Sequence, residues 1–277
     1  MTGILGASCR GLLGAALAAV TLWVCTPASP SMAASGATPE AALQDSSAGA
    51  TSGEGAGLES EGKVRLALFV VAHKVYNSEL MAPYDVLQHT IFRDSKNYVQ
   101  TAIVNADGKP FETFEGITVL PHYSFADAPT PDILVIPSTE GSMDKDLKDE
   151  AYMKWVTQAA KDAEWVITVC DGAFPLAATG LLDGRVATTF PGDRERFQEM
   201  FPEIDVRFDV RLVQDGKFIT SVGGGMSYEP AFYLVEKLYG KDHADKSARG
   251  LVWPWDLKTL PHFVAGSERT EDSAGED

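Results

Sequence analysis

Cys170 is the residue of this chain whose type and setting best suit covalent chemistry. It follows the apolar run 165–169 (WVITV) and precedes residues 171–174 (DGAF), which begin a predicted helix. A thiol at a strand-to-helix turn is presented at the sheet edge, and the helix N-terminus favours its thiolate. The backbone N–H of Asp171 would point toward an oxyanion formed on a substrate. The alternative is a buried, inert core cysteine.

Other residues with chemical potential give weaker signals. His73 follows the first apolar run and is a candidate auxiliary base, although a lone loop histidine is more often a surface residue. The run 223–225 (GGG) lacks the Lys-Ser/Thr of a phosphate loop, so we interpret it as close backbone packing near the site. The sequence contains no Cys-x-x-Cys and no His-x-x-x-His, so we expect neither a metal nor a cofactor.

The elements that would position Cys170 alternate between strand-like and helix-like patterns. Short apolar runs at 64–72, 98–104, 132–137 and 165–169 are typical of strands buried on both faces. Helical patterns lie between or after them, at 80–92, 144–163, 174–182 and 228–238. We further expect a strand at 206–213 to form a hairpin with 218–222 around Asp215-Gly216. This alternation predicts one α/β domain with a doubly wound, mostly parallel sheet and helices on both faces.

The two ends of the chain differ from this central part. In residues 1–33 Arg10 is the one charged side chain, an apolar run at 12–24 follows, and small residues precede Ala33. This pattern predicts an export signal, and hence a periplasmic or secreted protein; an uncleaved anchor, or a lipoprotein through Cys25, is the alternative. Residues 34–62 are an expected disordered, acidic Ala/Gly/Ser-rich linker, and 267–277 an expected disordered acidic tail.

Charge narrows the choice of partners. The chain of 277 residues carries 39 acidic and 23 basic side chains, for a formal net charge of −16. An acidic surface repels phosphate backbones and anionic lipid head groups. We therefore expect a mature protein that binds neither nucleic acid nor membrane.

Several segments resemble one known family. The stretch 166–190 (VITVCDGAFPLAATGLLDGRVATTF) is similar to the nucleophile-elbow signature of the ThiJ/PfpI family, within the class I glutamine-amidotransferase-like superfamily. Residues 131–137 (PDILVIP) and 221–234 (SVGGGMSYEPAFYL) resemble further family segments, and 248–266 resembles the isonitrile-hydratase-like branch. The resemblance covers roughly residues 63–266. It implies a flavodoxin-like domain, a small-molecule substrate and a homodimer.

The resemblance also assigns partners to the thiol. It places Glu79, in the segment 78–86 (SELMAPYDV), at the position of the family's carboxylic acid, where a protonated carboxyl could stabilise a thiolate or protonate substrate. Thr139 stands where the family usually has a glycine pair that supplies an oxyanion donor, although Ser and Thr there more often cap a turn. Phe190 occupies a position where many relatives carry histidine, so a Cys-His-acid triad is not expected.

Asp171 is a further departure from the family pattern. Its side chain could cap the following helix, which is the more common role, or oppose ionisation of the thiol. The sequence leaves three functions open. One is a cysteine-dependent hydratase, hydrolase or lyase acting on a small electrophile of the isonitrile or aldehyde type. The others are a non-catalytic redox sensor or chaperone-like protein with an oxidisable Cys170, and a binding scaffold.

Overall fold

The computed structural model describes residues 62–266. The predicted signal peptide (1–33), the predicted acidic tail (267–277) and all but the last residue of the predicted linker (34–62) lie outside the described residues. Within the described part, no helix is long and apolar enough to cross a membrane.

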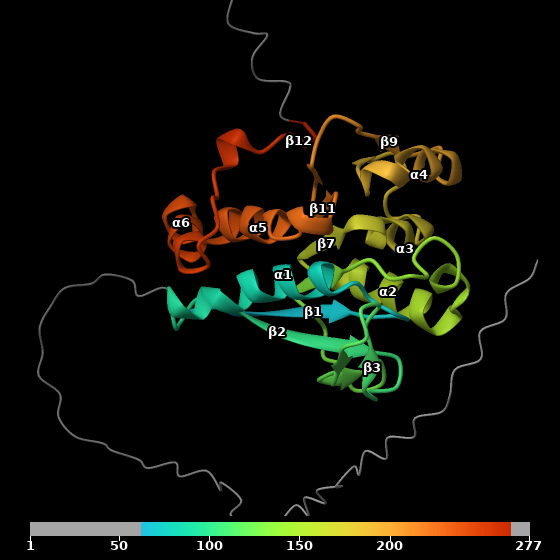
Figure 1. Ribbon diagram of the computed structural model, residues 1–277, viewed down its shortest axis with the longest axis horizontal. Helices are drawn as coiled ribbons and strands as arrows, with labels where there is room; N and C mark the ends of the chain where they lie inside the picture. Colours follow the sequence, from blue (N-terminus) through green and yellow to red (C-terminus); the bar gives the residue numbers. More distant parts are fainter. Residues whose placement is uncertain (1–61, 267–277) are drawn as a thin grey trace, which may run out of the picture. The chain divides into compact units, whose positions relative to one another are not determined.

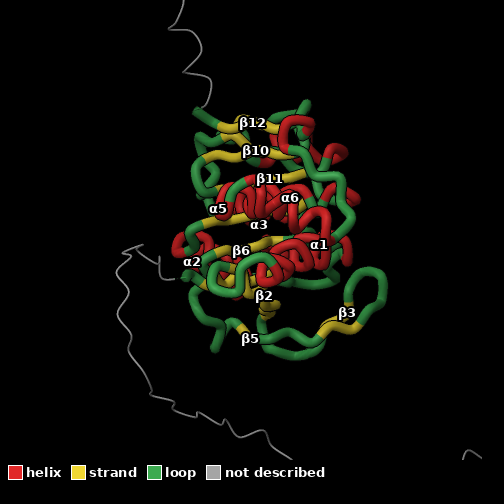
Figure 2. Tube along the Cα trace, turned by 90° about the vertical axis from the view of Figure 1, so that its left-hand side faces the viewer, coloured by secondary structure: helices red, strands yellow, loops and turns green. Residues whose placement is uncertain are grey.

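One sheet of eight strands organises the domain (Figure 2), and its order is β12-β10-β11-β7-β6-β1-β2-β5. Neighbouring strands pair in parallel, except that β10 runs antiparallel to β11. The mostly parallel, flavodoxin-like sheet that the sequence predicts is therefore confirmed. The strands are β1 Val64–Val70, β2 Tyr98–Asn105, β5 Tyr123–Ser124, β6 Ile133–Ile136, β7 Trp165–Val169, β10 Leu212–Asp215, β11 Phe218–Ser221 and β12 His262–Val264.

Helices cover both faces of this sheet (Figure 1), as the alternating pattern predicts. Side chains of β1 alternate between two cores: Ala67 and Phe69 pack on one side, and Leu68 and Val70 on the other. The first core is covered by α1 Asn77–Gln88, α5 Glu229–Tyr239 and α6 Lys241–Gly250. The second is covered by α2 Glu150–Asp162, α3 Ala173–Ala178 and α4 Arg194–Met200.

Short elements complete the connections. Two small sheets pair β3 Phe111–Glu112 with β4 Thr118–Val119, and β8 Val186–Ala187 with β9 Asp205–Val206. Single 3-10 turns occur at η1 His89–Phe92, η2 Asp146–Lys148, η3 Cys170–Gly172, η4 Pro191–Asp193, η5 Gly224–Met226 and η6 Leu257–Thr259.

The expected strand at 206–213 is wrong. Val206 ends β9, and β10 begins only at Leu212. The buried guanidinium of Arg194 donates to the carbonyl oxygens of Phe208 and Val210, the latter at 2.7 Å. Because these carbonyls are taken up by a side chain, the intervening residues do not extend a β-ladder. The hairpin around Gly216 is present as predicted, with Asp215 opposite Phe218.

Candidate active site

Cys170 lies where β7 ends and η3 leads into α3. Its backbone has φ +56°, a left-handed conformation that costs a non-glycine residue free energy. Two glycines make room for this turn. A Cβ at Gly172 would overlap the carbonyl oxygen of Ile136, and a Cβ at Gly223 would overlap the Cβ of Cys170 itself. The interpretation of the 223–225 run as close backbone packing is therefore confirmed for Gly223, whereas a Cβ at Gly224 or Gly225 would meet nothing within 4 Å.

Glu79 enters the site from the first turn of α1. Its side chain is 4% exposed, and its Oε1 accepts a hydrogen bond from the Gly224 N–H at 3.3 Å. The other oxygen, Oε2, is buried without a hydrogen-bond partner among the described residues. Burial raises the pKa of Glu79 to about 7, the charge of Asp171 adds to the rise, and the thiol of Cys170 lowers it. A large fraction of the Glu79 side chains is therefore protonated at neutral pH.

The sulfur of Cys170 is held in an environment that disfavours its ionised form. Cys170 is 6% exposed, and its Sγ lies 3.8 Å from Oδ2 of Asp171. Burial raises the pKa of the thiol most, and the charges of Glu79 and Asp171 raise it further, while the Asp171 N–H acts in the opposite direction. This raised pKa is opposite to the lowering expected from a helix N-terminus, because burial and the charges of two carboxyl groups outweigh the hydrogen bond from the Asp171 N–H.

Asp171 contributes its side chain as well as its backbone. It is 9% exposed, and its Oδ1 lies 3.0 Å from the donating hydroxyl of Thr189. Burial raises its pKa first, and the charge of Asp193 raises it further. No side-chain cap bonds form at η3 or α3, so the expected capping role of Asp171 is wrong.

A cavity of about 330 Å³ opens onto these groups. Its apolar rim includes Phe190 and Met143, which are 41% and 39% exposed. Two further lining residues, Tyr76 and Asp193, carry no sequence signal that sets them apart from other loop residues. The cavity is lined by Tyr76, Glu79, Met143, Cys170, Asp171, Phe190 and Asp193. It therefore gathers three carboxyl groups, a phenol and a thiol, with no basic side chain among its lining residues.

Thr139 and His73 are not placed as expected. The Thr139 N–H donates to the Ser142 hydroxyl at 2.9 Å, so it is already used and does not offer an oxyanion donor in this geometry. His73 is exposed and does not line the cavity; its charge acts instead on the buried carboxyl of Asp146. The structure thus brings Glu79 and Asp171 to Cys170, and leaves His73 and the Thr139 N–H out of the site.

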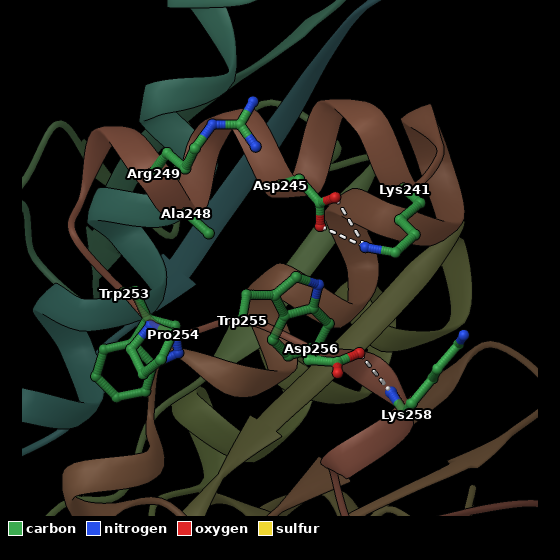
Figure 3. A pocket seen from close by; sticks show the side chains of 9 residues that line it. All are labelled: Lys241, Asp245, Ala248, Arg249, Trp253, Pro254, Trp255, Asp256 and Lys258. Carbon is green, nitrogen blue, oxygen red and sulfur yellow. Dashed lines mark hydrogen bonds and ion pairs between the residues drawn. The ribbon is translucent and has the colours of Figure 1, made fainter.

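A larger hollow of about 440 Å³ lies between α6 and the segment 253–258 (Figure 3). Lys241 and Asp245 pair with each other on its wall at 2.7 Å, and Trp253 and Trp255 form an aromatic side. None of its lining residues is a cysteine, serine or histidine. The cavity at Cys170 therefore remains the candidate active site, because it alone of these two hollows holds a thiol with an acid beside it.

No group of three or more His, Cys, Asp or Glu side chains in residues 62–266 is arranged to hold a metal ion.

The sequence of this chain is similar to those of several known proteins. The profile of the DJ-1/PfpI family matches residues 65–237. An isonitrile hydratase of Pseudomonas putida is 29% identical over 207 residues, which cover 74% of this chain and 84% of the relative. The protein DJ-1alpha of Drosophila melanogaster is 26% identical over 193 residues, covering 68% of this chain and 84% of the relative.

Solved structures show the same fold. A ThiJ/PfpI family protein from Pseudomonas syringae aligns with a TM-score of 0.63 at 20% identity, covering 71% of this chain and 78% of that one. DJ-1beta of Drosophila melanogaster aligns with a TM-score of 0.60 at 22% identity, covering 70% of this chain and all of that one. At these identities the likeness concerns the fold.

Proposed function

The chain belongs to the DJ-1/PfpI family, and from this premise we propose that it is a cysteine-dependent enzyme that adds water to a small electrophile. An isonitrile is the substrate class we favour. One observation carries the proposal: a buried, neutral thiol at a strained turn lies beside a carboxyl group that is substantially protonated at neutral pH. The similarity to an isonitrile hydratase supports the choice of substrate.

The chemistry of an isonitrile matches this pair of groups. Its terminal carbon accepts a proton and a nucleophile at the same atom, so a thiol and an acid that share one cavity suffice. A full thiolate is not required, because protonation of carbon by Glu79 accompanies attack by sulfur. A reaction of this kind tolerates a thiol whose pKa is raised. A reaction that must begin from the thiolate would be slowed by the same raised pKa.

The addition balances without a cofactor. Glu79 gives its proton to the isonitrile carbon, the Cys170 sulfur bonds to the same carbon, and the thiol proton passes to the Glu79 carboxylate. The product is a thioimidate, R–N=CH–S–Cys170. Water then adds across its C=N bond, the C–S bond breaks, and an N-substituted formamide leaves while the thiol is restored.

The lining of the cavity restricts the substrate. Glu79, Asp171 and Asp193 give it negative character, and no lysine, arginine or histidine lines it to pair with an anion. Desolvating a substrate anion beside these carboxyl groups costs free energy that nothing in the cavity offsets. Uncharged electrophiles with an apolar arm that packs on Phe190 and Met143 fit this lining best.

A redox-sensing role receives less support from the same geometry. Oxidation to sulfenic acid begins from the thiolate, and both burial and neighbouring charge keep Cys170 in its thiol form. Aldehydes remain the second substrate class, because a protonated Glu79 could also donate to a carbonyl oxygen as the sulfur adds.

Turnover of a small alkyl isonitrile tests the proposal, with the formamide identified by NMR and an α-oxoaldehyde as the parallel substrate. We expect formamide from the wild type and a loss of at least about a hundredfold in Cys170→Ala and in Glu79→Gln. Asp183→Asn, which alters an exposed loop acid, is the matched control and keeps full activity. Equal formamide production by wild type and Cys170→Ala would refute the mechanism. Turnover of the aldehyde alone would show that the substrate is an aldehyde and not an isonitrile.

Export and self-association are part of the proposal. The pattern of residues 1–33 supports cleavage by a signal peptidase, and the family resemblance supports a homodimer. The mature N-terminus, read by mass spectrometry of the protein from a bacterial periplasm, and the mass in solution by light scattering test the two statements. An intact residue 1 would refute the first, and a monomer at micromolar concentration the second.

A further inference from the structure

Asp193 brings a third carboxyl group to the cavity, next to Asp171. It ends the 3-10 turn Pro191–Asp193, whose backbone closes through a 3.0 Å hydrogen bond from the Asp193 N–H to the Phe190 carbonyl. Both aspartates line the same cavity as the Cys170 sulfur. Burial raises the pKa of Asp171 most, and the neighbouring carboxyl group of Asp193 raises it further.

Among the described residues, no lysine, arginine or histidine lines the cavity beside this pair. The nearest basic residue in sequence, Arg194, turns away and donates to the Thr188 hydroxyl and to the carbonyl oxygens of Phe208 and Val210. The other ionisable groups that face Asp171 are acids, and the neutral Thr189 hydroxyl is its remaining donor. These acids are Glu79 on α1, Tyr76 before it, and Cys170 on η3, and the exposed Glu140 lies within reach of Tyr76.

Two carboxyl groups in one low-dielectric cavity ionise together less readily than either does alone, so a negative charge on one favours the protonated form of the other. Asp171 is the buried member, and its Oδ2 contacts the reacting sulfur at 3.8 Å. Asp193 is only partly buried and therefore acts on the sulfur through Asp171. Glu79 is held by a different element, since its Oε1 accepts a hydrogen bond from the Gly224 N–H, and the charge of Asp171 also raises the pKa of Glu79.

We infer that Asp171 and Asp193 form a proton-sharing pair in which Asp171 is a second catalytic acid and Asp193 is a positioning residue that keeps Asp171 protonated. The inference rests on the proposed function and assigns the second half of that reaction. Glu79 serves the addition of the thiol, and Asp171 serves the hydrolysis of the thioimidate.

The hydrolytic step balances through the two oxygens of one carboxyl group. Asp171 gives its proton to the imidate nitrogen while water bonds to the carbon, and a proton of that water passes to the other Asp171 oxygen. The resulting hydroxyl then loses its proton as the C=O bond forms and the C–S bond breaks, and Asp171 relays that proton to the sulfur. Asp171 is protonated before and after the cycle, so activity falls as pH rises through its pKa.

Carboxyl titration and kinetics together test this inference in the full-length mature protein. Carbon-13 labelling of the aspartate carboxyls gives a resonance for Asp171, identified by its loss in Asp171→Asn. We expect it to titrate well above the ordinary range of aspartate in the wild type, and at least about one pH unit lower in Asp193→Asn. The descending limb of kcat/KM for the isonitrile should move to lower pH in Asp193→Asn.

Glu195→Gln is the matched control, because it removes an exposed acid two residues beyond Asp193 on α4 and should change neither measurement. An Asp171 carboxyl that titrates in the ordinary range, or one that Asp193→Asn leaves unmoved, would overturn the inference whatever the substrate. A protein that turns over no isonitrile, but whose Asp171 titration responds to Asp193→Asn, would instead refute the proposed reaction and retain the proton-sharing pair.

Discussion

Replacing Glu79 with glutamine measures the free energy that burial of this carboxyl costs the folded protein at neutral pH. The amide of glutamine has the shape of the protonated acid, can accept the Gly224 N–H on its oxygen, and does not ionise. The folded pKa of Glu79 is raised from 4.5 to about 7. Below pH 4.5 both folded and unfolded states hold the proton, so the group has no effect on the pH dependence there.

Between pH 4.5 and 7 the unfolded state releases its proton before the folded state does, so stability falls as pH rises. Each unit of difference in pKa is worth about 1.4 kcal/mol, so the full effect is about 3 kcal/mol and is complete above pH 7. We therefore expect the difference in free energy of unfolding between Glu79→Gln and the wild type to grow by about 3 kcal/mol in favour of the variant from pH 4.5 to pH 8. Total stabilities of 5–15 kcal/mol leave this change easy to measure.

Urea unfolding at pH 4.5, 6 and 8, followed by tryptophan fluorescence, is the assay. Asp171 also has a raised pKa and destabilises the protein in the same direction, but it is present in both proteins and largely cancels in the difference. Glu203→Gln removes an exposed carboxyl and should track the wild type at all three pH values. A difference between Glu79→Gln and wild type that is constant with pH would show that Glu79 ionises normally in the folded protein, and the proposed acid would be lost.

Three further substitutions test the packing around the site. Gly223→Ala should destabilise the protein by about 2 kcal/mol or more in urea unfolding, because its Cβ would overlap Cys170 at a backbone φ of +71°; unchanged stability would contradict the close approach. Arg194→Met should cost roughly 2–4 kcal/mol, since the carbonyl of Phe208 loses its donor, and a neutral result would mean that water replaces the guanidinium. Val252→Gly should raise the melting temperature by about 2 °C, because a 90% exposed valine at φ +54° is strained and buries nothing; a lower melting temperature in circular dichroism would refute that reasoning.

Sequence patterns predicted the sheet because its central strands are buried on both faces. The run Trp165–Val169 reads as a continuous apolar strand, and the structure has β7 with the same bounds. Helix α6, Lys241–Gly250, has no counterpart among the predicted elements. It buries only Ala244, Ser247 and Ala248, and such small residues give a weak apolar period.

The site was harder to predict because its electrostatics depend on distances between segments that are far apart in sequence. Local rules gave Cys170 a helix N-terminus and hence a favoured thiolate, but they contain no information on which carboxyl groups fold against the sulfur. The sequence around Asp193 matches no motif for a catalytic acid. The residue lines the cavity because the turn Pro191–Asp193 brings it there. Thr139 illustrates the opposite error. The sequence suggested that its N–H could donate to an oxyanion, but in the structure this N–H donates to the Ser142 hydroxyl.

The short turn at 223–226 serves the nucleophile and the acid at once. Gly223 lies against the backbone of Cys170, and the next N–H, that of Gly224, is bound to Glu79. A shift of this turn would displace both Cys170 and Glu79. Disorder of the turn would therefore abolish activity by disturbing both residues together, rather than by weakening the contribution of one of them. Ligands or substitutions that rigidify residues 223–226 should accordingly fix the positions of the thiol and the carboxyl group together, even though neither side chain belongs to the turn.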